Sequence, residues 1–271
     1  MIEPAESARY FAVGDIHGAL KPLLEELSWQ GLVDSVGRWQ GGNSHVYFLG
    51  DYLDRGPHGL GVIDVLMQLE VSAREAGGGV HALLGNHEVL ALGTKLFGTQ
   101  ALETATGPRN FHASWVRNGG QNSDQEGLSP RHVQWLMDRP AVALAGTELL
   151  LHSDTTAYLE FGSTVSEVNT TIGAALRSEN LEQLWNVWAR MTTRGAFRGV
   201  QGHTNSVSML NSLGGERIIH GHSIISEVHG YLAFETAGPE EYAGGLAVDI
   251  DAGLYDGGPC LVFELIPPKA H

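Results

Sequence analysis

The sequence predicts an α/β domain whose first strands run parallel. In the first third, short apolar runs alternate with helix-like segments, and the runs are RYFAV (9–13), SHVYFL (44–49) and VHALL (80–84). None alternates strictly between apolar and polar residues, as expected for strands buried on both faces. The glycines that follow them, Gly14, Gly50 and Gly85, lie 36 and 35 residues apart. That spacing is about the length of one β-α unit, so helices should link parallel strands.

The remaining elements follow in order along the chain. PLLEELSW and GLGVIDVLMQLE are helix-like links between the first strands, and another helix is expected to start after GNHE. AVALAGTELLLHSD (141–154) predicts a hairpin around Gly146 and Thr147. Residues 164–191 look helical. ERIIHGHS predicts a strand and a turn, GYLAFE another strand, and GGLAVDIDAGLYDGGPCLVFEL a final pair of strands.

Residues 93–135 are the least regular block of the first half, with TATGPRN and RNGGQNSDQEG between aromatic residues. We interpret this block as an irregular insertion that borders a site. Neither a linker nor a low-complexity tract divides the chain. The sequence therefore predicts a single domain over residues 1–271.

Charge and cysteine content exclude several classes of function. The formal net charge of -15 disfavours non-specific binding to nucleic acid or an anionic membrane. Cys260 is the only cysteine, which excludes an internal disulfide and thiolate-rich metal sites. The N-terminus lacks a secretion signal, and no stretch approaches the roughly 20 apolar residues of a membrane span. We expect a cytoplasmic monomer without nucleic-acid or membrane partners.

Polar side chains gather at the predicted strand ends. They are Asp15, His17, Asp51, Asp54, Arg55, Asn86, His87 and Glu88, followed later by His152, His220 and His222. Because parallel strands joined by helices have their carboxyl ends at one edge of the sheet, we expect the first three turns to converge. Carboxylates and imidazoles without thiolates suit divalent manganese, iron or zinc. The strand ends therefore predict a metal site.

This set of residues suits phosphoryl chemistry. Asp51 follows the middle one of the three predicted strands and is the candidate to bridge two ions. Two such ions can together clamp a phosphoryl group. The planar guanidinium of Arg55 can grip phosphate oxygens. Asp54 can orient His87, which would then protonate the leaving alkoxide.

GDIHG, GDYLDRG and GNHE, in this order and spacing, resemble the three signature motifs of the PPP phosphoprotein phosphatases, within the calcineurin-like metallophosphoesterases. WVRNGG (115–120), VWAR (187–190) and HGHS followed by VDIDAG resemble later segments of that family. The resemblance extends from about residue 10 to 266 and points to a bacterial or phage-type branch. It implies a sandwich of two mixed β-sheets flanked by helices.

The resemblance also implies roles for individual residues. Metal one would be held by Asp15, His17 and bridging Asp51, and metal two by Asp51, Asn86, His152 and His222. His87 and Asp54 would form the acid pair, while Arg55, Arg190 and Asn86 would bind the substrate phosphate. The cofactors would be two divalent ions, with Mn2+ expected and iron or zinc as alternatives. A metal-bridging hydroxide would attack phosphorus directly, without a covalent phosphoenzyme.

Two assignments stay open at the level of sequence. The second phosphate arginine could be Arg194 or Arg198 instead of Arg190, because RMTTRGAFR places three arginines together. His203 and His222 both follow a glycine, and we prefer His222 because the apolar run RII precedes it. The remaining histidines, including His45 and His81, are expected to lie outside the site.

The function expected from these features is a metal-dependent phosphatase that hydrolyses phosphomonoesters, with phosphoprotein Ser/Thr or Tyr residues as substrates. A bis(5'-nucleosyl)-tetraphosphatase is one alternative, because such enzymes share similar early motifs. A non-catalytic metal-binding scaffold is another. The intact Asp54, His87 and Arg55 argue against the scaffold, since a pure binding protein has no use for an acid pair.

Overall fold

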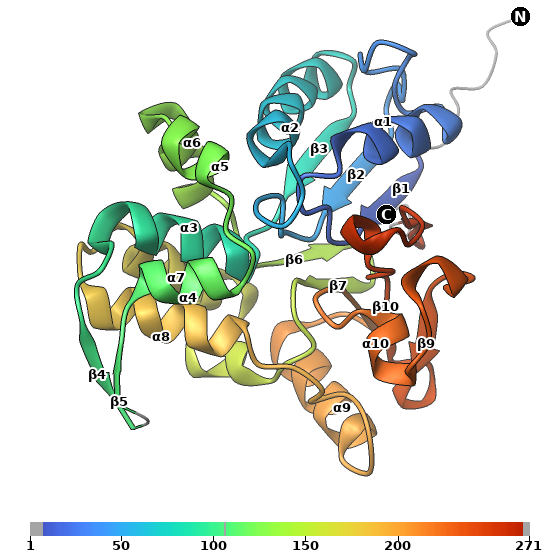
Figure 1. The fold of residues 1–271 in the computed structure, drawn as a ribbon. Helices are drawn as coiled ribbons and strands as arrows, with labels where there is room; N and C mark the ends of the chain where they lie inside the picture. Colours follow the sequence, from blue (N-terminus) through green and yellow to red (C-terminus); the bar gives the residue numbers. More distant parts are fainter. Residues whose placement is uncertain (1–7, 106, 268–271) are drawn as a thin grey trace, which may run out of the picture.

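Two β-sheets form the centre of the computed structural model, which describes residues 8–105 and 107–267 (Figure 1). The ends of the predicted 1–271 domain lie outside these ranges. The first sheet has the order β11-β1-β2-β3, with strands Val262–Glu264, Tyr10–Val13, His45–Phe48 and Gly79–Ala82. β1, β2 and β3 are parallel, as the β-α rhythm predicts, and β11 pairs antiparallel with β1.

The second sheet is also mixed. Its order is β6-β7-β8-β10-β9, with strands Val142–Ala145, Glu148–Leu151, Arg217–His220, Ala247–Asp249 and Glu240–Tyr242. β7, β8 and β10 are parallel, while β6 and β9 run antiparallel at the two edges. The predicted hairpin at 141–154 is therefore confirmed as β6 and β7. Two mixed sheets match the expected architecture.

The sheets pack face to face and helices cover their outer faces. Ala12, Leu49 and Leu83 of the first sheet form one buried cluster with Leu150 and Ile219 of the second. The alternate side chains of the strands face helices instead, since successive residues of a strand point to opposite faces. The covering helices are α1 (Leu20–Trp29), α2 (Gly59–Glu75), α7 (Val165–Arg177) and α9 (Gly202–Leu213), and α8 (Leu181–Met191) packs against α7.

The block at 93–135, predicted to be an irregular insertion, contains regular secondary structure. This block holds the end of α3 (Asn86–Phe97), the hairpin strands β4 (Leu102–Thr104) and β5 (Gly107–Arg109), and helices α4 (Phe111–Arg117), α5 (Asn122–Gly127) and α6 (Pro130–Met137). Asn110 and Ser129 cap α4 and α6 through their side chains. Because these helices are short and joined by glycine-rich turns, their 3.6-residue periodicity is hidden in the sequence.

Two further expectations are corrected. GYLAFE forms no strand but a 3-10 turn, Ala233–Glu235, in which Phe234 stays 68% exposed. The predicted helix at 164–191 is two helices, because Glu179 adopts a positive φ of 50° and Asn180 caps α8. The other short elements are Ala157–Glu160, α10 (Ile225–His229), Ala243–Gly245 and Leu254–Asp256. None of the helices in the described ranges has the length and apolar character to cross a membrane.

A ladder of stacked rings predicts pH-dependent stability. His45 stacks on Tyr10 and His81 on Tyr47, and His45 Nδ1 lies 3.2 Å from His81 Nε2. Burial and the neighbouring His45 lower the pKa of His81 to about 4. Histidine in the unfolded chain has a pKa near 6.5, so between about pH 6.5 and 4 the unfolded chain binds a proton at His81 that the folded protein does not bind. The free energy of unfolding should therefore fall as the pH drops from about 6.5 to 4.

Urea unfolding across this range should show a free energy of unfolding that depends less steeply on pH in His81→Gln than in the wild type. The exposed-site variant His112→Gln serves as control, and an unchanged slope in His81→Gln would contradict the assignment.

Candidate metal centre

The carboxyl ends of strands from both sheets converge on one buried constellation. Asp15 and His17 follow β1, Asp51 follows β2, and Asn86 and His87 open α3 just after β3. The second sheet contributes two side chains, His152 after β7 and His222 after β8. All seven side chains are buried. The structure therefore brings together every metal ligand that the sequence suggests.

Asp51 lies at the centre of the constellation. The ligand atoms of Asp15, Asp51, His152 and His222 lie within 4.8 Å of one another, and so do those of His17, Asp51 and His87. Asp51 Oδ2 is 3.4 Å from His17 Nε2, whereas Asp51 Oδ1 is 3.4 Å from His152 Nε2. The two carboxylate oxygens thus face different sets of ligands, which is the arrangement that a bridging ligand requires.

Asp15 lies between the two sets, whereas the resemblance groups it with His17 and the bridging Asp51. Its Oδ2 is 3.9 Å from His17 Nε2, and its Oδ1 is 3.9 Å from His152 Nδ1. Oδ1 also accepts the backbone N–H of His222 at 3.0 Å. Asn86 Oδ1 lies 2.8 Å from His152 Nε2, on the side of the second set.

The chemistry of these donors fits divalent cations. His17 Nδ1 donates to the carbonyl of Leu53 at 2.8 Å, which leaves Nε2 as an acceptor. That Nε2 atom is buried and has no hydrogen-bond partner among the residues that the structure describes. Burial lowers the pKa of His17 well below its ordinary value, so the ring is neutral and its lone pair is available. Burial, Asp251 and Asp51 raise the pKa of Asp15, and cations among these carboxylates would offset that repulsion.

His87 and Asp54 form a buried pair beside the ligands. His87 Nδ1 is 2.8 Å from Asp54 Oδ2, and the other carboxylate oxygen accepts from Trp115 Nε1 at 2.8 Å. Burial disfavours the charged ring, yet the Asp51 and Asp54 carboxylates outweigh it and raise the pKa of His87. The contact of Trp115 was not anticipated, although the WVRNGG segment contains that residue.

Backbone strain concentrates at this constellation. His17, Asp51, Asp54, Arg55 and His222 are five of the seven non-glycine residues with positive φ in the described ranges. Such conformations cost energy and persist only where surrounding contacts impose them, which is typical of functional sites. Gly85 allows the loops to approach closely, because a Cβ there would lie 2.3 Å from the Asp51 nitrogen.

Glu88 holds the loop in that conformation. Its Oε2 accepts the N–H groups of Asp51 at 2.8 Å and Gly85 at 3.0 Å, while Oε1 accepts those of Tyr52 at 2.8 Å and Leu53 at 3.3 Å. The sequence placed Glu88 at the strand end but gave it no role. It acts as the common acceptor for two loops.

We expect Glu88→Gln to destabilise the protein by about 2–4 kcal/mol, because an amide nitrogen would face two buried backbone donors and leave them unpaired. Urea or thermal unfolding measures the effect. Glu75→Gln, at the exposed end of α2, is the matched control. Equal stability of the two variants would contradict this role of Glu88.

The three candidate arginines differ in the groups with which they interact. Arg190 Nε lies 2.8 Å from Glu160 Oε2, and Arg198 pairs with Glu240 and Asp249 at 2.8 and 2.9 Å. Burial and the neighbouring His152 lower the pKa of His222 most, and the charge of Arg194 lowers it further. The charge of Arg194 thus acts on two members of the constellation, His152 and His222.

Arg55 contacts Tyr255, which in turn contacts the constellation. Its guanidinium lies over the ring of Tyr255, 4.6 Å from the centroid, and that ring also makes an edge contact with His17 at 5.3 Å. The charge of Arg55 lowers the pKa of His17 and opposes the rise in that of Asp15. Tyr255 is a neighbour of the site that sequence reasoning missed, because it follows the last strand of the second sheet.

Two other histidines lie outside the constellation. Both ring nitrogens of His220 form hydrogen bonds outside the constellation. Nδ1 lies 2.9 Å from the Gly221 carbonyl, and Nε2 lies 2.5 Å from the Tyr242 hydroxyl. His203 is exposed at the start of α9 and bonds to the Ala243 carbonyl at 3.0 Å. The preference for His222 over His203 is therefore consistent with the structure.

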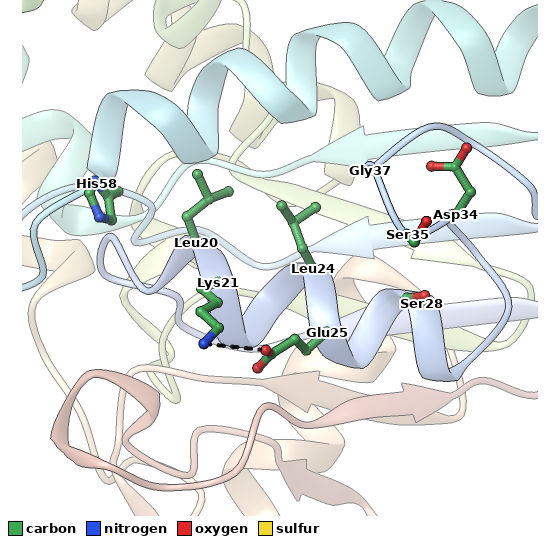
Figure 2. Close-up of a pocket in the computed structure, with 9 residues that line it drawn as sticks. All are labelled: Leu20, Lys21, Leu24, Glu25, Ser28, Asp34, Ser35, Gly37 and His58. Carbon is green, nitrogen blue, oxygen red and sulfur yellow. Dashed lines mark ion pairs between the residues drawn. The ribbon is translucent and has the colours of Figure 1, made fainter.

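A separate pocket of about 610 Å³ lies between α1, the start of α2 and the turn at 34–37 (Figure 2). Leu20 and Leu24 line it, and Lys21 Nζ pairs with Glu25 Oε1 at 3.7 Å on its rim. None of the clustered ligands lines this pocket. It is distinct from the candidate metal centre.

Comparison with known proteins agrees with this geometry. The family model described as calcineurin-like phosphoesterase matches residues 8–225. Shewanella-like protein phosphatase 2 of Arabidopsis thaliana is 42% identical over 82 residues, covering 30% of this chain and 21% of that protein. A bis(5'-nucleosyl)-tetraphosphatase of Bacillus cereus is 33% identical over 86 residues, covering 29% of this chain and 31% of that protein. The chain thus matches less than a third of the length of either relative.

Solved structures show the same fold. The cold-active protein-tyrosine phosphatase of a psychrophilic Shewanella species superposes with a TM-score of 0.72, covering 95% of this chain and 75% of that one. The sequence identity is 22%. At that identity the likeness concerns the arrangement of strands and helices alone.

Proposed function

The chain belongs to the calcineurin-like phosphoesterase family, and we propose that it is a dinuclear metal-dependent phosphatase acting on phosphomonoesters of phosphoproteins. The observation that supports this most is Asp51, whose two oxygens face two buried sets of ligands. His17 and Asp15 would hold one ion with Asp51. Asn86, His152 and His222 would hold the other. When bound, the ions supply Lewis acidity that activates water and offsets phosphate charge.

The remaining residues have roles that follow from their contacts. Arg55, whose guanidinium lies over Tyr255, would bind phosphate oxygens. His87 Nε2 faces the ligands, 4.0 Å from Asp51 Oδ2, while Nδ1 is fixed by Asp54. His87 would therefore donate a proton from Nε2 to the leaving oxygen.

Arg194 is proposed as the second phosphate-binding arginine in place of Arg190. Its charge acts on His152 and His222, whereas Arg190 is paired with Glu160. We expect Arg194→Ala to raise KM or lower kcat for a phosphomonoester by about tenfold or more, since charge-assisted contacts to phosphate contribute about 1.5–3 kcal/mol. Arg190→Ala is the matched control. A larger loss in Arg190→Ala than in Arg194→Ala would reverse the assignment.

Hydrolysis of a chromogenic aryl phosphate by the purified protein with Mn2+ tests the activity. We expect turnover that is lost with a chelator and restored by Mn2+, with iron and zinc compared in parallel. Phosphopeptides bearing phosphoserine, phosphothreonine or phosphotyrosine would define the substrate class. Two equivalents of bound metal without turnover on any phosphoester would favour the scaffold. A cytoplasmic location and a monomeric state stay predictions from the sequence.

A bis(5'-nucleosyl)-tetraphosphatase is the second candidate, because a relative of that name shares 33% identity over 86 residues. That enzyme class cleaves the anhydride of a dinucleotide instead of a phosphomonoester. Comparing kcat/KM for diadenosine tetraphosphate and for phosphopeptides separates the two. Higher kcat/KM on the dinucleotide would replace the proposed function.

A further inference from the structure

The turn that carries Arg55 is held by the segment 119–124, which runs from the end of α4 into α5. The carbonyl of Gly119 accepts the backbone N–H of Arg55 at 2.8 Å. The side-chain amide of Gln121 donates to the Arg55 carbonyl at 3.2 Å and to the Gly119 carbonyl at 3.3 Å. Gly119 has a φ of 87°, in the region that favours glycine. The segment therefore bonds to both polar backbone groups of Arg55.

Asp124 holds the residue before Arg55 by its backbone. The side chain of Asp124 is buried, and its Oδ2 accepts the backbone N–H of Asp54 at 3.3 Å. Its Oδ1 accepts the backbone N–H of Leu60 at 3.3 Å. Gly59 leaves room for the carboxylate, because a Cβ at that position would lie 2.3 Å from Asp124 Oδ2. The carboxylate of Asp124 thus joins Asp54 to the first turn of α2.

Asp54 and Arg55 need such contacts because both have left-handed backbone conformations. Their φ angles are 66° and 63°. For residues other than glycine these conformations cost energy, and they persist where surrounding contacts impose them. The backbone direction in turn decides where the two side chains lie, with Asp54 against His87 and Arg55 over Tyr255. The segment 119–124 therefore helps to set the geometry of both side chains.

The same part of the chain is attached to α3, the helix that begins with Asn86 and His87. α4 packs closely on α3, since a Cβ at Gly93 would lie 2.3 Å from the ring of Phe111. Trp115 of α4 also donates to the carboxylate of Asp54 at 2.8 Å. The helices α3, α4 and α5 thus hold the two members of the acid pair in one frame.

We propose that Asp124 and Gln121 are positioning residues of the phosphatase. Asp124 keeps the Asp54 carboxylate aligned with His87, and Gln121 keeps Arg55 directed at the substrate phosphate. This inference rests on the proposed function. Both residues act through the backbone of the turn, but they serve different events, which are protonation of the leaving group and binding of phosphate. Their loss should therefore change different kinetic constants.

Asp124→Asn tests the first role. Its amide nitrogen would face one of the two backbone donors, so Asp54 or Leu60 would lose its acceptor. We expect kcat on a phosphoserine peptide to fall about tenfold, because a misaligned acid pair protonates the leaving oxygen poorly. The loss should be at least about threefold smaller on an activated aryl phosphate, whose leaving group needs little protonation. Glu126→Gln, at an exposed position of the same helix, is the matched control and should change neither rate.

A double variant separates positioning from general damage. In His87→Asn the acid is already absent, so the addition of Asp124→Asn should lower kcat by less than about twofold. A purely structural defect would lower kcat by the same factor in both backgrounds, and that result would overturn the role of Asp124. Unchanged kcat in Asp124→Asn alone would overturn it as well. So would a loss of bound Mn2+ as large as the loss of kcat, because the defect would then lie in the metal centre.

Gln121→Ala tests the second role at a half-buried position, without removing a buried charge. We expect KM to rise about threefold on the phosphoserine peptide and on the aryl phosphate alike, the size typical of one lost hydrogen bond. The ratio of kcat between the two substrates should stay the same. The exposed neighbour variant Asn122→Ala is the matched control. The rise in KM should vanish in the Arg55→Ala background, and an equal rise there would contradict the role of Gln121.

The wild-type protein distinguishes the two levels of failure. No metal-dependent turnover of the aryl phosphate would refute the proposed function and this inference together. Turnover by the wild type, with an unaltered dependence on the leaving group in Asp124→Asn and an unaltered KM in Gln121→Ala, would refute the positioning roles alone.

Discussion

Asp51→Asn should lower kcat for phosphomonoester hydrolysis by about 10³-fold or more, or about 4 kcal/mol of transition-state stabilisation. An asparagine can keep its oxygen toward His152 and the backbone N–H of His87, which lies 2.9 Å from Asp51 Oδ1. Its amide nitrogen would then replace Oδ2, the atom that faces His17 Nε2. An amide nitrogen does not ligate a divalent cation, so the bridge would be broken on one side.

Metal content distinguishes this explanation from general damage to the site. We expect the wild type to bind two equivalents of Mn2+ and Asp51→Asn to retain about one, as measured by equilibrium dialysis and elemental analysis. Asp64→Asn removes a half-exposed aspartate of α2 that pairs with Arg131, and it should match the wild type in both assays. Circular dichroism should show that both variants are folded. Two retained equivalents, or normal kcat, in Asp51→Asn would contradict the bridging role.

The first sheet and its loops could be predicted because local sequence encodes them. A buried parallel strand needs a short apolar run, and the glycine after it permits the close approach seen at Gly85. Parallel strands then bring their carboxyl ends together by topology alone. For that reason Asp15, Asp51 and Asn86 could be assigned to one site without a structure.

The other contacts of the site depend on tertiary packing that local patterns do not contain. Arg198 pairs with Glu240 and Asp249 instead of facing the site, and these two residues lie 42 and 51 residues away along the chain. β10 and β11 are consecutive strands yet join different sheets, so the position of Tyr255 between them could not be read from periodicity. The short helices in 93–135 were missed because capping and glycine turns, more than hydrophobic periodicity, define them.

His87→Asn should lower kcat by about 10²–10⁴-fold on a substrate with a poor leaving group, the range typical of a lost general acid. His87 Nδ1 is fixed by Asp54 at 2.8 Å, and Asp54 is in turn held by Trp115 at 2.8 Å. Because the three act as a unit, Asp54→Asn should cause a similar loss, and the double variant little more than either single one. Trp115→Phe, which removes the N–H donor together with one ring of the indole, should have a smaller effect.

The leaving group gives the sharper test of proton donation. An aryl phosphate with an acidic phenol needs little protonation to depart, whereas an alkyl phosphate such as phosphoserine needs it fully. The loss in His87→Asn should therefore be at least about tenfold larger on the phosphoserine peptide than on the activated aryl phosphate. His112→Asn, an exposed histidine of α4, is the matched control and should change neither rate. Equal losses on both substrates would assign His87 to positioning of the phosphate or the ligands and would refute its role as the acid.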